Sequence, residues 1–117
     1  MRTFRIALAN LRFPSSPAES VALTERAIVD AGSAGAGLVC FPEAYVPGYR
    51  VGKDIAAPDM AFLEDAWSAI GAAAAREKVT AVVGTERIVA GARRLSALVV
   101  DATGKRLLGE RRAPLAG

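Results

Sequence analysis

The run that decides the fold is Leu38-Val39-Cys40-Phe41-Pro42-Glu43, four apolar residues followed by a proline and a carboxylate. A short apolar run between a glycine and a proline predicts a strand buried on both faces, as in a parallel sheet covered by helices. Open parallel sheets place their ligands past the carboxyl ends of their strands. Glu43 stands at such an end, and its apolar neighbours are expected to remove part of its water shell. A desolvated carboxylate is suited to act as a general base; a solvated loop carboxylate or a cap is the alternative interpretation of Glu43.

Upstream of this run, the sequence predicts one strand and one helix. Residues 4–9 alternate, and Phe4, Ile6 and Leu8 are expected to face the core. The run 16–19, Ser-Pro-Ala-Glu, is typical of a helix start. Serine caps the helix, proline fits its first position, and the glutamate can return a hydrogen bond.

Downstream, the sequence predicts a loop, a second helix and three strands. The expected ranges are 42–57 for the loop, 60–78 for the helix, and 80–84 with a continuation to 89, 95–101 and 106–108 for the strands. Early alternation of strands and helices implies parallel strands with right-handed crossovers, and the last two turns add antiparallel strands at an edge. We therefore predict one α/β domain over residues 1–117 with a mixed sheet, in the order strand-helix-strand-helix-strand-strand-strand.

The composition excludes several classes of protein. The chain of 117 residues has a net charge of +3, one cysteine and no histidine. Without histidine there is no Ser-His-Asp triad, no Cys-His pair and no histidine-bound metal, and one cysteine forms no internal disulfide. The basic residues are not interleaved with stacking aromatics, so no nucleic-acid partner is expected. No segment has the pattern of a signal peptide or a membrane span, which predicts a cytoplasmic protein without a membrane partner.

Two further groups are expected near Glu43. Glu86 ends the third predicted strand at the same edge of the sheet, so it can border the same cleft; a surface ion pair with Arg87 is the alternative. Cys40 shares a strand face with Leu38 and has no histidine to activate it, which favours a buried, inert thiol. A thiol enzyme that uses Cys40 and Glu43 stays open as another interpretation.

Three segments of the chain carry a family resemblance. Residues 5–10, 38–49 and 83–87 together resemble the amino-terminal part of the nitrilase superfamily of carbon-nitrogen hydrolases, and the likeness extends to about Gly109. The Phe-Pro-Glu run 41–43 corresponds to the first catalytic motif of that family. Residues 45–49 resemble the nitrilase or cyanide-dihydratase-like branch. The resemblance implies the first half of a four-layer αββα sandwich.

The resemblance also implies a mechanism based on a Glu-Lys-Cys triad. Glu43 is expected to be the general base, a cysteine to attack a nitrile or amide carbon, and a lysine to stabilise the tetrahedral species. Tyr49 and Glu86 are expected to bind the substrate, and neither a metal nor an organic cofactor is expected.

Two members of that triad do not match this sequence. The position of the family's lysine falls on Ala113, or on Arg112 if the alignment shifts by one residue, and Cys40 precedes the glutamate motif instead of following the lysine. We therefore expect a truncated hydrolase domain that is inactive alone. Because a half-sandwich leaves apolar faces uncovered, it is expected to form a homo-oligomer or to join a complementary chain. The alternative is a non-catalytic α/β binding or interaction module on the same scaffold.

Overall fold

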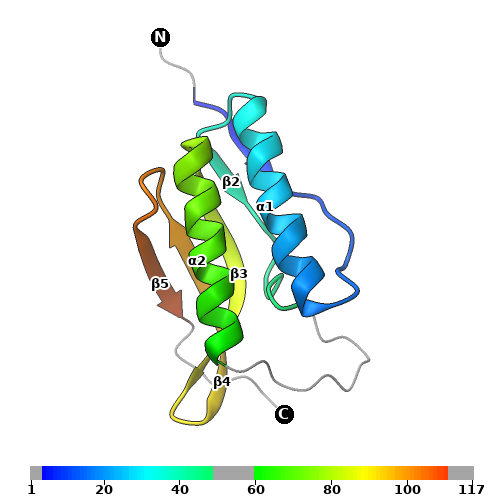
Figure 1. The fold of residues 1–117 in the computed structure, drawn as a ribbon, viewed down its shortest axis with the longest axis vertical. Coiled ribbons are helices and arrows are strands. Elements are labelled where there is room, and N and C mark those ends of the chain that lie inside the picture. Colours follow the sequence, from blue (N-terminus) through cyan, green and yellow to red (C-terminus); the bar gives the residue numbers. More distant parts are fainter. Residues whose placement is uncertain (1–3, 49–59, 111–117) are drawn as a thin grey trace.

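The computed structural model describes residues 4–48 and 60–110, with the side chains of 108–110 excepted. Two helices and five strands follow one another in the predicted order (Figure 1). They are β1 (Ile6–Leu8), α1 (Pro17–Ser33), β2 (Leu38–Cys40), α2 (Met60–Glu77), β3 (Thr80–Val89), β4 (Ala92–Val100) and β5 (Arg106–Glu110). In the described part of the chain, no helix is both long and apolar enough to cross a membrane.

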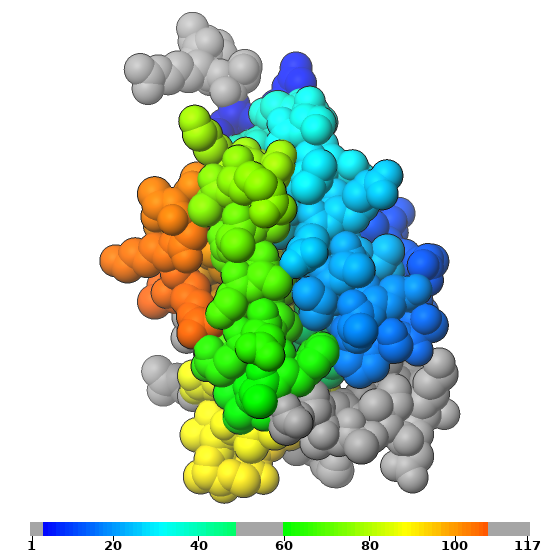
Figure 2. Space-filling view, in the orientation of Figure 1, coloured from blue at the N-terminus to red at the C-terminus, as the bar shows by residue number. Residues whose placement is uncertain are grey.

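The five strands form one mixed sheet in the order β1-β2-β3-β4-β5. β1, β2 and β3 are parallel, whereas β4 and β5 run antiparallel to their neighbours. Both helices lie side by side on one face of this sheet, and their side chains form a continuous layer in Figure 2. The predicted α/β class and the mixed sheet are therefore confirmed.

The start of α1 follows the predicted capping pattern with one difference. Ser16 accepts a hydrogen bond from the backbone N–H of Glu19 at 3.1 Å, and Pro17 occupies the first helical turn. The carboxylate of Glu19 bonds instead to the backbone N–H of Ser15, at 2.7 Å. The cap therefore also holds the connection that leads from β1 into the helix.

The core lies between the sheet and the two helices. Its largest fully buried apolar side chains are Ile28, Val39, Val46, Leu63, Ile70, Val79, Val83, Leu98 and Val100. Trp67 of α2 lies in this layer as well, and its indole N–H donates to the hydroxyl of Thr85 on β3 at 3.1 Å. This hydrogen bond satisfies a polar pair inside an otherwise apolar layer.

The predicted core face of β1 is wrong. Phe4, Ile6 and Leu8 are 67%, 58% and 79% exposed. The other face of the strand meets the helices, because Ala7 is in register with the buried Val39. Alternation identifies the two faces of a strand but does not say which one the helices cover. The small alanine fits beneath a helix, and the large side chains lie on the opposite side.

These side chains belong to an apolar surface that extends across all five strands, which we call the open face. Register and burial assign to it Ile6, Leu8, Leu38, Cys40, Val82, Ala97, Val99 and Leu107. Among the described residues, no helix or strand covers it. Leu38 and Cys40 are half-buried, so the prediction that their strand is buried on both faces is wrong, as is the prediction of a buried thiol.

Polar substitution on the open face is expected to reduce self-association without unfolding the protein. Leu8→Ser removes a largely exposed side chain, so the free energy of unfolding changes by less than about 0.5 kcal/mol. Binding of a hydrophobic dye and the sedimentation-average mass both fall, because the apolar surface shrinks.

A matched control lies on the adjacent strand but faces the helices. Val39→Ala lowers the free energy of unfolding by about 2 kcal/mol, because it opens a cavity in the core. Equal destabilisation by both variants, measured by urea unfolding, would contradict the assignment of the two faces.

Candidate functional site

Glu43 lies on a detour that leaves the sheet after β2 and returns beside β3. The backbone N–H of Phe41 still donates to Val82 at 2.9 Å, as in a parallel ladder. The chain then rises over the sheet and rejoins it at Val46, whose N–H donates to the carbonyl of Gly84 at 3.1 Å. Val46 in turn accepts a hydrogen bond from the N–H of Glu86 at 3.1 Å. Both ends of the four-residue detour are therefore held by β3.

Gly84 determines how closely this detour approaches the sheet. A Cβ atom at that position would lie 2.6 Å from Glu43 Cα and from the nitrogen of Ala44, and closer still to the carbonyl oxygen of Pro42. Real Cβ atoms do not make such contacts with backbone, so only glycine fits. The turn also places Ala44 in the left-handed region, at φ 53°. That conformation costs an L-residue about 1–2 kcal/mol.

The structure brings Glu43 and Glu86 to the same part of the open face. Glu86 lies two residues beyond Gly84, so its side chain leaves the strand on the same side, and it is 2% exposed. Glu43 is exposed, in contrast to the expected desolvation. The difference has a physical reason, because no helix or strand of the described residues covers the sheet beside it. Tyr49 lies outside the described residues.

A hollow of about 290 Å³ lies next to Glu43. Its lining consists of Leu11, Phe13, Pro14, Pro42, Glu43 and Tyr45. Residues 11–15 lie between the predicted strand and the predicted helix start, and the sequence patterns did not predict this wall. The available signal was the run Leu-Arg-Phe-Pro, which places three apolar residues in a connecting segment, because exposed loops seldom carry several large apolar residues without packing them.

The wall of this hollow is braced by polar contacts. The hydroxyl of Tyr45 donates to the carbonyl of Arg12 at 3.2 Å. The guanidinium of Arg12 donates to both carboxylate oxygens of Glu19, at 2.8 and 3.1 Å. These bonds and that from Ser15 lower the pKa of Glu19 to about 2, and burial raises the pKa of Tyr45. The detour, the connection 9–16 and the start of α1 are thereby tied together.

Cys40 has the surroundings of a structural thiol. The register places it between Leu8 of β1 and Val82 of β3. An activated thiol needs a neighbouring base or positive charge, and these two neighbours are apolar. Within the described ranges, no group of three acidic, cysteine or histidine side chains is arranged to hold a metal ion.

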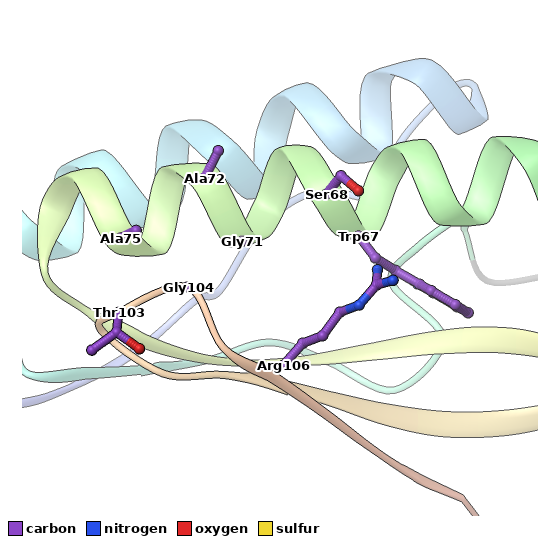
Figure 3. Close-up of a pocket in the computed structure, with 8 residues that line it drawn as sticks. All are labelled: Trp67, Ser68, Gly71, Ala72, Ala75, Thr103, Gly104 and Arg106. Carbon is purple, nitrogen blue, oxygen red and sulfur yellow. The ribbon is translucent and has the colours of Figure 1, made fainter.

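A second hollow, of about 380 Å³, lies between α2 and the β4–β5 turn (Figure 3). Arg106 extends from β5 toward α2, with its guanidinium 5.8 Å from the centre of the Trp67 ring and 2.7 Å from a carboxylate oxygen of Glu64. Small side chains form most of the remaining wall: Ser68, Gly71, Ala72, Ala75, Thr103 and Gly104. The cation–π contact and ion pair attach the edge strand to the helix layer, which is a structural role.

A model of the carbon-nitrogen hydrolase family matches residues 5–113. The fold is similar to solved structures of an amidase from Nesterenkonia sp. AN1. One, a mutant with glutamine in place of a glutamate and with acrylamide added to its active-site cysteine, has a TM-score of 0.81 and 23% identity over 98% of this chain and 46% of that chain. A mutant in complex with butyramide has a TM-score of 0.77 and 23% identity, over 97% and 44%. The chain thus spans less than half the length of these structures. No curated protein matches it.

Adding one methyl group at Gly84 is expected to displace the Glu43 segment. Gly84→Ala lowers the free energy of unfolding by about 1–3 kcal/mol, because the backbone of residues 42–44 must move away. The amide resonances of Glu43 and Val46 shift with it.

Gly71 provides the matched control for this substitution. A Cβ there meets its nearest atoms at 3.5 and 3.6 Å, so Gly71→Ala gains helix propensity and stabilises the chain by up to about 1 kcal/mol. If Gly84→Ala is as well tolerated as Gly71→Ala in urea unfolding and in the spectra, the close approach is not a constraint.

The contribution of Glu19 to stability is expected to vanish in acid. Its folded pKa of about 2 lies below the usual 4.5, so the stabilisation is fully present above pH 4.5 and is lost as pH falls toward 2. Glu19→Gln therefore unfolds at lower urea concentration than the wild type at neutral pH, and the two converge in acid. Ser16→Ala removes the cap of the same helix without removing an ionising group, so its cost of about 1 kcal/mol persists at every pH. A difference in urea midpoint between Glu19→Gln and the wild type that does not change with pH would contradict the ion pair.

Proposed function

The chain belongs to the carbon-nitrogen hydrolase family, and on that premise we propose that it supplies the general base, Glu43, for hydrolysis of a small amide or nitrile. The observation that carries the proposal is the detour over Gly84, which holds the Phe-Pro-Glu run past the end of β2 by hydrogen bonds at both ends. A base must be held within hydrogen-bond reach of the proton that it takes. Backbone fixed to a central strand meets that need better than a free loop.

The proposed chemistry follows from a carboxylate base and a thiol nucleophile. Glu43 accepts the thiol proton while sulfur bonds to the amide carbon, and the proton passes to the nitrogen as the C–N bond breaks. The same carboxylate then deprotonates a water molecule, which releases the acid and restores the thiol. Glu86, buried two residues beyond Gly84, and Tyr49 are proposed to contact the substrate. We assign no metal or organic cofactor to these steps.

The nucleophile and the lysine of this scheme are proposed to come from a complementary chain. The one cysteine of the sequence, Cys40, lies in the sheet among apolar neighbours. Ala113 and Arg112, the candidate positions for the lysine, lie outside the described part, and neither is a lysine. Arginine retains the charge of lysine but not its compact ammonium group. The chain by itself is therefore proposed to be inactive.

The open face supports association with a second α/β layer, supplied by a complementary chain. A sheet face that carries apolar side chains on all five strands is stabilised when a second sheet packs on it. The same observation supports the second candidate function, a non-catalytic interaction module. The two candidate functions differ in the role of Glu43, which the hydrolase needs for catalysis and the interaction module does not.

A hybrid enzyme tests the proposed role of Glu43. The chain replaces the corresponding amino-terminal part of the Nesterenkonia amidase, and ammonia release from butyramide is measured. Glu43→Gln is expected to lower kcat/KM by at least about 100-fold, the contribution of a positioned general base. Asp65→Asn on the exposed side of α2 leaves kcat/KM unchanged.

Folding of the hybrid is monitored by its thermal transition. A cooperatively folded hybrid that hydrolyses nothing, or one that keeps its activity after Glu43→Gln, would favour the interaction module.

A further inference from the structure

We infer that the hollow between α2 and the β4–β5 turn is a binding site for a small organic carboxylate, whose anionic group pairs with the guanidinium of Arg106 (Figure 3). This hollow lies on the helix side of the sheet, because Arg106 precedes the open-face residue Leu107 in β5 and leaves the strand on the other side. Glu43 lies on the open side. The inference therefore goes beyond the proposed function and does not depend on it.

The hollow has the dimensions of a small-molecule site. Its volume is about 380 Å³, within a range that begins near about 300 Å³. The helix wall runs from Trp67 to Ala75, which is about 12 Å along the axis at about 1.5 Å per residue. Arg106 lies at the Trp67 end, and Thr103 lies at the Ala75 end (Figure 3). Because a cavity of about 150 Å³ is enough for benzene, one ring with its carboxylate group fits.

The guanidinium of Arg106 is held in place while most of its donors are unused. It lies 5.8 Å from the centre of the Trp67 ring. That ring is 3% exposed and is fixed by the hydrogen bond of its indole N–H to Thr85. A guanidinium offers its N–H donors in a rigid fork that matches a carboxylate. Among the described residues, the fork makes one hydrogen bond, to Glu64 at 2.7 Å.

The carboxylate of Glu64 occupies the position that a ligand carboxylate would take. The side chains of Arg106 and Glu64 are 41% and 49% exposed, and an ion pair at this exposure contributes little to stability. A ligand that accepts from two donors of the fork forms one charge-assisted hydrogen bond more than Glu64 does. Glu64 is therefore a competitor that the ligand displaces.

The middle of the hollow suits a hydrocarbon body. A Cβ on Gly71 would lie 3.5 Å from the carbonyl oxygen of Gly104 and 3.6 Å from a methyl group of Val100, so the helix and the turn meet there and bound the hollow. Ala72 and Ala75 line it with methyl groups. A ligand with a ring or a short alkyl chain covers this apolar surface, whereas a bare inorganic anion does not.

The turn that forms the far wall is rigid before any ligand arrives. The carboxylate of Asp101 accepts hydrogen bonds from the backbone N–H groups of Thr103 and Lys105, at 2.9 and 3.1 Å, and from the hydroxyl of Thr103 at 2.6 Å. These bonds lower the pKa of Asp101. A preformed wall binds with less loss of conformational entropy than a wall that must order itself.

The test is a titration of the isotope-labelled full chain with benzoate, monitored by backbone amide resonances. Benzoate is expected to shift the amides of Ser68, Ala72 and Gly104 in a saturable manner. Benzamide has the same shape without the charge, and acetate and inorganic phosphate have the charge without the ring. Each of these three is expected to bind at least about tenfold more weakly.

Two variants of the ion pair have opposite expected effects on benzoate binding. Arg106→Gln removes the guanidinium and weakens binding at least about tenfold, whereas Glu64→Gln removes the competing carboxylate and strengthens binding about threefold. Both variants break the same ion pair, so a merely structural role predicts equal effects. Arg76→Gln removes a cation from the same helix, one that pairs with Glu77, and leaves the affinity unchanged. Thermal transitions establish that each variant is folded; should Arg106→Gln not fold, the titration of Glu64→Gln decides.

Four results would overturn the inference. These are the absence of a saturable shift, equal binding of benzoate and benzamide, binding of acetate or phosphate as tight as that of benzoate, and a Glu64→Gln variant that binds benzoate no more tightly than the wild type. Glu43→Gln separates the inference from the proposed function, because it is expected to abolish turnover in the hybrid and to leave benzoate binding unchanged.

Discussion

The rest of the site depends on one steric constraint, the contact between the backbone of residues 42–44 and the bare Cα of Gly84. Because nothing projects from Gly84, the detour lies directly on β3 and regains the sheet at Val46 after four residues. The same path turns Tyr45 inward, where its ring meets Phe41 with centroids 6.0 Å apart. A larger residue at 84 would move Glu43, the hollow and the aromatic pair together, because all three belong to one short segment.

The second determining feature is that the sheet is covered on one face only. Both helices pack against the side that carries Val39, Val83 and Leu98, and this layer is built from small and aliphatic side chains with a single tryptophan. The stability of the described part therefore comes from one α/β interface. The opposite side also carries apolar residues on every strand. In a sheet with one solvated face, polar residues usually occupy that face and alternate with the apolar residues of the core face. The pattern of side chains is that of a sheet with two apolar faces.

Much of the fold could be predicted because its signals are local. Ser16 and Pro17 mark the start of the first helix through local capping, and the apolar stripe that includes Trp67 indicates the second helix by its spacing. The incorrect predictions concern which face of a strand the helices cover, whereas the order of helices and strands was predicted correctly. Phe4, Ile6 and Leu8 alternate correctly, but alternation does not reveal which side the helices cover, and size favoured the wrong side. The wall from Leu11 to Pro14 was missed for a related reason, since it is formed by a tertiary contact between the hydroxyl of Tyr45 and the carbonyl of Arg12.

The exposure of Glu43 and the exposure of the open face have the same origin. Glu43 lies above Gly84 on the side of the sheet that the helices leave free, so any layer that covers Leu38, Val82 and Val99 also approaches its carboxylate. Packing that removes water from the apolar strands would then remove water from Glu43, and desolvation is what adapts a carboxylate to accept protons. A second layer on the open face would therefore change the surroundings of the proposed base as well as those of the apolar strands.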